Sequence, residues 1–386
     1  MPGSNDRIVI VGAGPTGLAL AAELQRLGTP ALLFEKKAAP PATSRAVIVH
    51  ARTLEVLEPL GVAQRVIERG LPLNEARMHE GDTTRMHVSF DGLNTAYPYA
   101  LALPQDQTEA VLTGRLRELG EAVTRSVEVT GIDADSTGAT LTYTAAGVLV
   151  QHIRAGWVIG CDGLHSTVRQ AAGIEFEGGT YDENFVLGDV EMDFPLERNG
   201  MDLFFAPTGF LLIVPLPGNR YRVFATVREP GGSPSMEDLQ KLLDERGPQM
   251  NKARIRSMAW SSHYRIQHRV ASTLRSGRMI VLGDAAHVHS PAGGQGMNTG
   301  IQDAVSLAGV LHRVITTGDE APLAEWEKKR LEIARSVVRT TDLMTRAATS
   351  DSSVSRILRN ALMGVVDHIP ALQHGIAERL SEIDNR

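Results

Sequence analysis

The sequence has few of the residues on which several common classes of protein depend. Its single cysteine, Cys161, rules out an internal disulfide and a cysteine-rich metal site. No apolar run approaches the ~18 residues needed to cross a bilayer, and the 12 histidines do not include the H-E-x-x-H spacing of a zinc protease. We therefore expect no metal and no membrane span. Cys161 follows an apolar run and is expected to be a small buried packing residue.

The sequence also has no strong excess of charge of either sign. The chain of 386 residues has 39 basic and 45 acidic residues, a net charge of −6, and its basic residues do not gather into one run. This balance argues against a nucleic-acid partner. Residues 1–6 lack the charged and then apolar pattern of a secretory signal, so we expect a cytoplasmic protein. The length allows about two or three domains.

A glycine-rich motif is the clearest feature that the sequence does contain. The apolar run 8–11 leads into G-A-G-P-T-G at 12–17, and apolar residues then recur at helical spacing. In a strand, turn and helix of this kind, Gly12 permits the tight turn, and Gly14 lets backbone approach a pyrophosphate. Gly17 allows the helix and strand to pack closely.

The residues around this motif strengthen the prediction of a dinucleotide site. Pro15 suits the first position of a helix, and Thr16 follows it. The helix start offers unpaired N–H groups and a positive dipole end to phosphates. A second apolar strand over 31–34 ends at Glu35, about 20 residues beyond the motif, where a carboxylate binds ribose hydroxyls and repels a 2′-phosphate. The sequence thus predicts FAD or NAD rather than NADP at this position.

Two further stretches are expected to complete the cradle. Asp162 and Gly163 follow the apolar run 157–160, and G-D-A-A-H at 283–287 follows a buried strand predicted over 278–283. The loop 287–296 then contains three glycines within four residues before a helix that opens near Asn298. Such a loop lets backbone N–H groups approach a planar ligand, and the helix start would stabilise a negative charge on it.

The remaining segments suggest how the chain divides. Strand patterns cover 185–194, 201–206, 210–216 and 221–228, which favours a second, mostly antiparallel sheet. We expect a discontinuous nucleotide-binding domain at 1–71, 105–172 and 270–320, a substrate-binding β-sheet domain at 72–104 and 173–269, and a C-terminal helical region at 321–386. The charged stretch 326–330 is interpreted as a solvated helix face.

With these motifs in this order, the chain resembles the class A flavoprotein aromatic hydroxylases of the para-hydroxybenzoate hydroxylase type, over nearly its whole length. The resemblance implies an α/β fold: a Rossmann-like FAD-binding domain with an inserted antiparallel sheet and a C-terminal helical segment. It also implies a single-component, NAD(P)H-consuming monooxygenase. Such an enzyme hydroxylates a phenolic or polycyclic substrate with O2, through a hydroperoxide at C4a of the flavin.

The resemblance assigns roles to particular residues. Glu35 would hold the adenosine ribose beside Lys36, Arg45 the pyrophosphate, and Asp284 the ribityl hydroxyls. Gln105, in the turn after Pro104, would contact the ribityl chain or ring edge, and Asp162 with Gly163 would lie near the pyrophosphate. Around the isoalloxazine ring, the resemblance implies contacts from Pro291, which would sit at its reacting edge, and from Gly294, Gly296, Met297 and Asn298.

Assignments for substrate and catalysis rest on weaker signals. Alternating apolar residues of the second sheet, Phe205, Leu212, Val214 and Phe224, would form the wall opposite the flavin. A base that activates a phenol is sought among His50, His289 and Tyr181. The sequence leaves open a FAD-dependent reductase or dehydrogenase without oxygen insertion, and a non-catalytic FAD-binding protein. The sequence does not decide between NADH and NADPH, and it does not identify the substrate. It also leaves the oligomeric state open, with a homodimer as one alternative.

Overall fold

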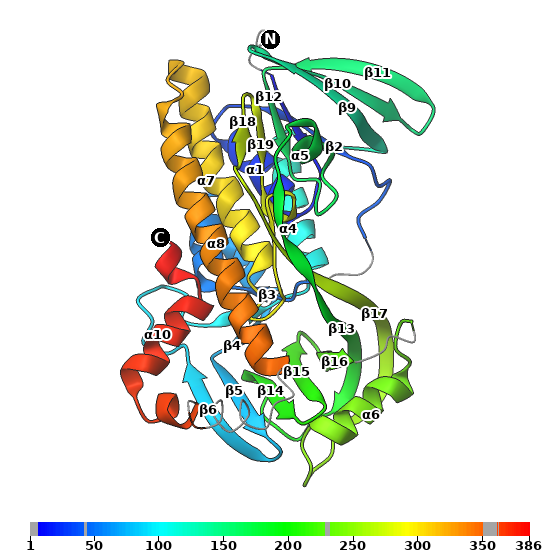
Figure 1. Cartoon of the computed structure of the whole chain (residues 1–386), viewed down its shortest axis with the longest axis vertical. Helices are drawn as coiled ribbons and strands as arrows, with labels where there is room; N and C mark the ends of the chain where they lie inside the picture. Colours follow the sequence, from blue (N-terminus) through cyan, green and yellow to red (C-terminus); the bar gives the residue numbers. More distant parts are fainter. Residues whose placement is uncertain (1–6, 42–44, 228–231, 350–360, 362) are drawn as a thin grey trace.

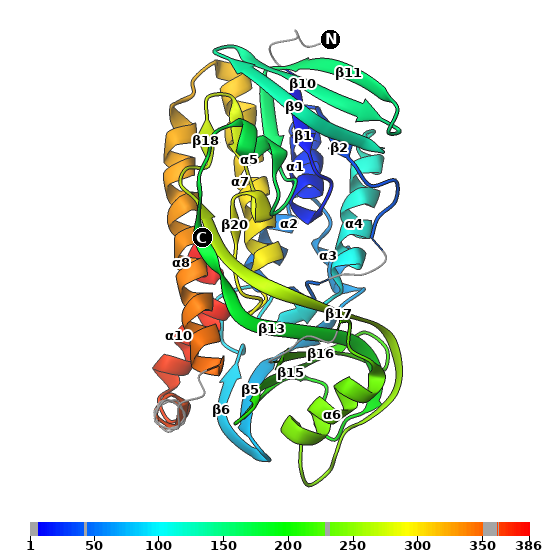
Figure 2. The same cartoon turned by 45° about the vertical axis from the view of Figure 1, so that its right-hand side comes forward.

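The computed structural model describes residues 7–386 except 42–44, 228–231, 350–360 and 362. Two large sheets occupy opposite ends of the molecule, and the long helices α7 (Gly296–Thr317) and α8 (Ala321–Thr349) run along one side of it (Figures 1 and 2). Within the described residues, no helix combines the length and the apolar character that a membrane span requires.

The first sheet has six strands and carries the dinucleotide motif. Its order is β18 (Arg275–Ser276), β19 (Met279–Val281), β12 (Trp157–Gly160), β1 (Ile8–Val11), β2 (Ala31–Glu35) and β8 (Val123–Arg125). All neighbours pair in parallel except β18 and β19. Every residue of β1 and β12 is buried, as continuous apolar runs in a covered parallel sheet should be. This confirms the α/β fold class.

Helices cover the first sheet and bring distant segments together. The helix α1 (Pro15–Arg26) packs against both α4 (Gln105–Glu118) and α7. Between the strands lie the shorter helices α2 (Ala51–Leu57), α3 (Ala63–Ile67), α5 (Thr167–Ala171) and α6 (Met236–Arg246) and the 3-10 turn η1 (Gly283–Ala285). After the last strand and α8 come α10 (Pro370–Leu380) and the 3-10 turn η2 (Ile383–Asn385). Pro15 begins α1, as the sequence predicts, and Gly28, at φ 79°, follows the end of the helix.

The second sheet has eight strands and lies at the opposite end of the molecule. Its order is β20 (His287–Val288), β17 (Arg254–Ala271), β13 (Phe176–Asp193), β16 (Arg220–Val227), β15 (Gly209–Leu216), β14 (Gly200–Ala206), β5 (Glu75–Glu80) and β6 (Thr83–Ser89). Only β14 and β5 pair in parallel. The predicted strands from 185 to 227 are confirmed. The sequence analysis missed β17, because its 18 residues are mostly polar and half-buried and show no clean alternation.

Two small sheets complete the fold. The strands β9 (Val127–Asp135), β10 (Gly138–Ala145) and β11 (Leu149–Ala155) form an antiparallel meander that projects beside the first sheet (Figure 2). The strands β3 (Ile48–Val49), β7 (Ala100–Ala102) and β4 (Leu71–Leu73) form the other, and Figure 1 shows β3 and β4 between the two large sheets.

The structure corrects the interpretation of 326–330 as a solvated face. The Trp326 side chain is buried, and the carboxylate of Glu327 accepts hydrogen bonds from the Leu274 and Arg275 backbone N–H groups at 2.9 and 3.2 Å. It also accepts one from the Thr273 hydroxyl. Arg330, equally buried, pairs with Asp303 of α7. The charged stretch therefore fastens α8 to the loop before β18 and to α7.

The contacts of Glu327 lead to a stability prediction. Replacing it with alanine, Glu327→Ala, removes the acceptor of two backbone N–H groups and should lower the free energy of unfolding by about 2 kcal/mol. The exposed neighbour provides the control, since Lys328→Ala should change it by less than about 0.5 kcal/mol. Urea denaturation of the three proteins measures both values. Equal stability of the Glu327 and Lys328 variants would contradict the assigned role.

Candidate dinucleotide site

The first two glycine-bearing motifs touch through their backbones. Gly12 has φ 101°, and a Cβ atom there would lie 2.3 Å from the carbonyl oxygen of Cys161. A Cβ atom on Gly17 would lie 2.0 Å from the carbonyl oxygen of Gly12. No side chain fits at either position, so glycine is the only residue that permits this approach.

The third motif joins them through Thr16 and Arg169. A Cβ atom would lie 2.6 Å from the Thr16 hydroxyl if placed on Gly283, and 2.4 Å from it if placed on Gly300 of α7. The guanidinium of Arg169, in α5, donates to the carbonyl oxygens of Ala285 and Leu164 at 2.9 and 2.8 Å. Segments more than 100 residues apart thus form one contiguous structure, as the sequence predicts.

A cavity of about 260 Å³ opens where the first two motifs meet. Its wall includes Gly12, Gly14, Glu35, Lys36, Gln105 and Asp162, all predicted as cofactor-binding residues. Pro15, Thr16 and Gly163 lie beside it in the chain but are not part of the wall, and the third motif lies outside it. A Cβ atom on Gly14 would meet nothing within 4 Å, so the chain leaves space at the position predicted for a phosphate.

Sequence reasoning missed four charged residues of this cavity: Lys37, Glu109, Arg125 and Glu128. Lys37 lies two residues after Glu35, the acid predicted to bind ribose, and a search for charges after the second strand would have found it. Arg125 lies on the edge strand β8 and Glu109 one turn into α4, and neither position has a sequence signal of its own. The backbone N–H groups of Ala13 and Lys37 each donate to Glu35 at 2.9 Å, so its carboxylate holds the glycine turn in place.

The structure corrects the setting of Gln105. The helix α4 begins at Gln105, so this residue belongs to the first helical turn and not to a turn between elements. Its amide nitrogen donates to Glu109 at 2.8 Å. Burial raises the pKa of the Glu109 carboxyl. The pair therefore presents the cavity with an amide oxygen and a carboxyl group.

Asp162 and Cys161 form the wall contributed by the second motif. Asp162 accepts hydrogen bonds at Oδ2 from the N–H groups of Thr167 and Val168, at 2.7 and 3.2 Å. Its other oxygen, Oδ1, is buried and has no partner among the described residues. Burial raises the pKa of Asp162 and raises that of the Cys161 thiol well above its usual value. Cys161 packs against the first core as expected, yet it is only half-buried because it also faces the cavity.

Asp284, the predicted contact for the ribityl hydroxyls, has an exposed side chain in an otherwise buried turn. Its side chain is exposed to solvent, whereas its neighbours Gly283 and Ala285 are buried. Enough protein surrounds the carboxyl for burial to raise its pKa, and the charges of His287 and Arg45 act against that rise. An exposed carboxyl group between two buried residues suits the predicted contact with hydroxyl groups.

The loop before α7 has a defined shape held by two histidines. Gly293 and Gly294 have φ of 82° and 66°, and the Gly294 N–H donates to the Pro291 carbonyl at 2.9 Å. His50 contacts the Gly293 carbonyl through Nε2 at 2.7 Å, and His289 contacts the Ser290 carbonyl through Nδ1 at 2.8 Å.

Because a carbonyl only accepts, each of these imidazoles must carry its proton at the bonded nitrogen. Burial lowers the pKa of both His50 and His289 to about 4, which keeps them neutral. Their other nitrogens, Nδ1 of His50 and Nε2 of His289, are buried acceptors without a partner in the described structure.

Asn298 holds the loop through its side chain. Its amide nitrogen donates to the carbonyls of Ile48 and Gly294, both at 2.8 Å, and its oxygen accepts from the His50 N–H at 2.9 Å. The residue is fully buried. Among the predicted ring contacts at the start of α7, Asn298 therefore has only its backbone to offer, as Gly296 does, while Met297 is partly buried against the first core.

Arg45 connects this region to the second sheet. Its guanidinium lies over the Tyr264 ring at 5.5 Å, and its carbonyl accepts from Arg222 at 2.6 Å. Arg222 is buried and paired with Asp189 at 2.5 Å. This ion pair joins the strands β13 and β16, and the hydrogen bond from Arg222 fixes the backbone at Arg45.

An aromatic cluster lies beside Tyr264 and contains part of the predicted substrate wall. The rings of Phe185 and Phe224 stack with centroids 5.5 Å apart, and Phe210 and Tyr264 lie 5.6 and 6.1 Å from Phe224. The four predicted wall residues, Phe205, Leu212, Val214 and Phe224, all belong to or pack against the same core. Tyr181 joins it too, but its hydroxyl donates to Asp342 of α8 at 2.7 Å and burial raises its pKa.

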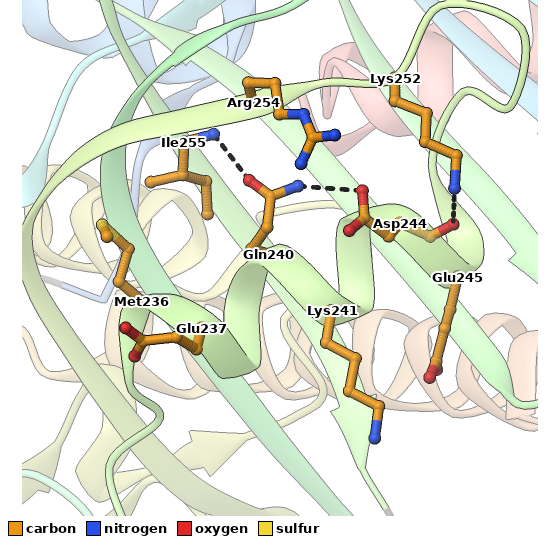
Figure 3. Close-up of a pocket in the computed structure, with 9 residues that line it drawn as sticks. All are labelled: Met236, Glu237, Gln240, Lys241, Asp244, Glu245, Lys252, Arg254 and Ile255. Atoms are coloured by element: carbon orange, nitrogen blue, oxygen red, sulfur yellow. Dashed lines mark hydrogen bonds between the residues drawn. The ribbon is translucent and has the colours of Figure 1, made fainter.

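A second hollow, of about 600 Å³, lies far from these motifs along α6 and the start of β17 (Figure 3). Gln240 crosses it, donating to Asp244 and accepting from the Ile255 N–H, while charged side chains such as Lys241 and Glu245 project outward. It shares no residue with the motif cavity. Its polar groups bond to one another, and nothing in it points to a ligand.

Comparisons with known proteins agree with this geometry. The family model described as FAD binding domain matches residues 6–341. The chain is 31% identical over 381 residues to the 6-methylpretetramide 4-monooxygenase of Streptomyces rimosus, covering 97% of this chain and 68% of that protein. It is 30% identical over 394 residues to the rifampicin monooxygenase of Streptomyces venezuelae, covering 98% and 79%.

Solved structures give the same result. The fold matches the p-nitrophenol 4-monooxygenase of Pseudomonas putida with a TM-score of 0.86 and 25% identity, covering 98% of this chain and 97% of that chain. It matches the anhydrotetracycline hydroxylase of Streptomyces rimosus with a TM-score of 0.81 and 31% identity, covering 98% and 76%.

The open space at Gly14 leads to a prediction on cofactor binding. Alanine is compatible with its φ of −73° and meets no atom, so Gly14→Ala should fold with unchanged stability. The added methyl group would occupy the space left for a phosphate and should weaken FAD affinity about tenfold or more, a loss of about 1.4 kcal/mol. Fluorescence titration of the flavin-free protein with FAD measures this affinity.

Gly17→Ala is the matched control, because its Cβ atom collides with backbone and should destabilise the fold itself. Unchanged FAD affinity in a folded Gly14→Ala protein would show that the phosphates lie elsewhere.

Proposed function

The chain belongs to the family of FAD-dependent aromatic monooxygenases, and from this premise we propose that it uses NADH or NADPH and O2 to hydroxylate a phenolic or polycyclic compound. The observation that carries the proposal is the convergence of three distant glycine-bearing segments beside an aromatic cluster. FAD, when bound, supplies the redox chemistry that activates oxygen. The protein has to bind FAD, orient the substrate, exclude water and move a proton.

The described residues fit FAD over its length. We assign the adenosine diphosphate half to the 260 Å³ cavity, with phosphates at Gly14 and the start of α1 and the ribose at Glu35. Both oxygens of Glu35 already accept one backbone N–H each, and a carboxylate retains lone pairs for ribose hydroxyls. Lys36, Lys37 and Arg125 place positive charge around the same space.

The other half of FAD would extend toward the third motif. We assign the ribityl hydroxyls to Asp284, the pyrophosphate side to Arg45, and the ring to the loop 291–297. The loop's backbone N–H groups and the start of α7 would favour negative charge on the reduced ring. Pro291 would sit at the reacting edge. Gln105 and Asp162 would meet the cofactor near the boundary between the two halves.

For the substrate, we propose an apolar aromatic compound held against the second sheet. Leu212 and Phe224 are direct cross-strand partners, so their side chains share one face of the sheet. Together with Phe205 and Val214 they offer an apolar surface, which the Arg222–Asp189 ion pair borders on the same face of the sheet. This surface would orient the substrate and exclude water from the reacting atoms.

We assign the base to His289 and a structural role to His50. Both imidazoles are neutral, and each has one buried acceptor nitrogen without a partner among the described residues. The His50 side chain is enclosed throughout, whereas part of the His289 side chain is exposed. A phenol that enters beside this exposed part would bring its hydroxyl to His289 Nε2, which would accept the proton and raise the electron density of the ring. Tyr181 is not proposed, because its hydroxyl is held protonated against Asp342.

Three outcomes of one assay separate the candidate functions. NADPH or NADH oxidation that a phenol stimulates, with equal O2 uptake and a hydroxylated product, is the result that we expect. Substrate oxidation without oxygen insertion would indicate a reductase or dehydrogenase. No cofactor oxidation with any of a broad panel of phenols would support a non-catalytic FAD-binding protein.

The proposed base gives a second prediction. Removing the acceptor nitrogen in His289→Ala should lower kcat for a phenolic substrate about 100-fold. FAD affinity should change less than threefold. His50→Ala, in contrast, should weaken FAD affinity, since the Gly293 carbonyl loses its donor. A wild-type kcat in the His289 variant would remove this residue from the mechanism.

A further inference from the structure

The C-terminal segment places an acidic side chain behind the start of α7. Glu382 lies four residues before Arg386, the last residue of the sequence, and is completely buried. Its backbone has φ 59°, a left-handed conformation that is rare for a residue other than glycine. In both views, the C-terminal end of the chain (red) lies against α8 (Figures 1 and 2). Neither the motifs nor the proposed reaction uses this carboxyl group.

The bonding partners of Glu382 lie on the first two turns of α7. Oε1 lies 3.2 Å from the Thr299 hydroxyl, and Oε2 accepts from Gln302 Nε2 at 2.5 Å. The same hydroxyl lies 3.0 Å from the carbonyl of Gln295, the residue that precedes α7.

The hydrogen bonds of Thr299 agree with a protonated Glu382. A threonine hydroxyl has one proton, and it cannot donate to both the Gln295 carbonyl and the Glu382 carboxyl. If Glu382 carries a proton on Oε1, it donates to Thr299, and Thr299 donates to Gln295. An ionised carboxylate would draw the hydroxyl proton away from Gln295 and leave that carbonyl with the Thr299 backbone N–H, at 2.9 Å, as its donor.

The surrounding charges agree with the neutral form. Arg330 of α8 is the nearby cation, but its Nε donates to Asp303 of α7 at 2.5 Å. His287 of β20 also bonds to Asp303, at 2.6 Å. Asp384 of η2 adds negative charge, and α2 contributes only the uncharged Thr53 hydroxyl through Gln302. Burial outweighs Arg330 and the hydrogen bonds and raises the pKa of Glu382 to about 8.

Neighbouring residues of the same segment reach the glycine loop and α2. The carbonyl of Arg379 accepts from the Gln295 side chain at 3.1 Å, and the carbonyl of Ser381 accepts from the Arg52 N–H at 3.2 Å. Arg386 forms an ion pair with Glu55 of α2. The segment thus clamps the loop and both helices that border it.

We propose that Glu382, as a neutral carboxylic acid, is a positioning residue of the flavin site that holds the first turns of α7 and the loop before them. It acts through Thr299, Gln295 and Gln302 and does not touch the cofactor. The inference rests on the proposed placement of the ring at 291–297, and its test does not require hydroxylation.

Two substitutions separate the neutral acid from other roles. Glu382→Gln keeps a donor for Thr299 and an acceptor for Gln302 at every pH, so it copies the protonated acid. Glu382→Ala removes both. At pH 6.5 we expect FAD affinity within about twofold of wild type for the glutamine variant and at least tenfold weaker for the alanine variant. Glu378→Gln, which changes an exposed acid of α10, is the control.

The pH profile is the decisive readout. In the unfolded chain Glu382 loses its proton above its ordinary pKa, while the folded protein retains it to about pH 8. The unfolding constant of the wild type, divided by that of Glu382→Gln, should therefore rise as pH increases from 5 to 8, by up to about tenfold per pH unit. Above pH 8, the wild type should also lose FAD affinity that Glu382→Gln retains.

If the unfolding constants of the wild type and Glu382→Gln changed in parallel with pH, the claim that Glu382 is a neutral acid in the folded protein would be wrong. FAD affinity unchanged in Glu382→Ala would overturn the positioning role. A failure of the hydroxylation assay would leave both measurements intact, because FAD titration and denaturation do not depend on the substrate.

Discussion

The backbone contact between Gly12 and Cys161 is the constraint on which the site depends. It joins the parallel strands β1 and β12 just beyond their carboxyl ends, where ligands of open α/β sheets bind. Thr16 and Arg169 extend the contact to the third motif. Because no side chain could fit between these backbones, small residues at a few positions determine how three distant segments meet.

A second constraint is the set of hydrogen bonds that holds the loop before α7 in place. The loop before α7 contains little apolar side-chain surface of its own, so other elements fix its shape. His50 and Asn298 bond to its backbone, the C-terminal segment bonds to the Gln295 side chain at its end, and Arg330 and Asp303 fasten α8 to α7. These hydrogen bonds limit the freedom of the glycines that permit close approach to a planar ligand.

The sequence predicted the parts of this protein that depend on local pattern. Buried strands, the turn at Gly12, the helix start at Pro15 and the acid at Glu35 all have signals within a short window, and the structure confirms these elements. The sequence could not predict the partners of charged groups on helices, such as Glu327 and Arg330. A helix face has the same sequence pattern whether water or another element covers it. Glu109 and Arg125 were missed because only the fold brings them to the cavity, and β17 because it lacks alternation.

A crystal structure of the FAD-loaded protein would test the account most directly. We expect the pyrophosphate beside Gly14 at the start of α1, the adenosine ribose on Glu35, and the isoalloxazine ring against the backbone of the loop 291–297. Electron density for FAD that avoids the Gly12 and Cys161 junction, or that leaves this loop without contact, would contradict it.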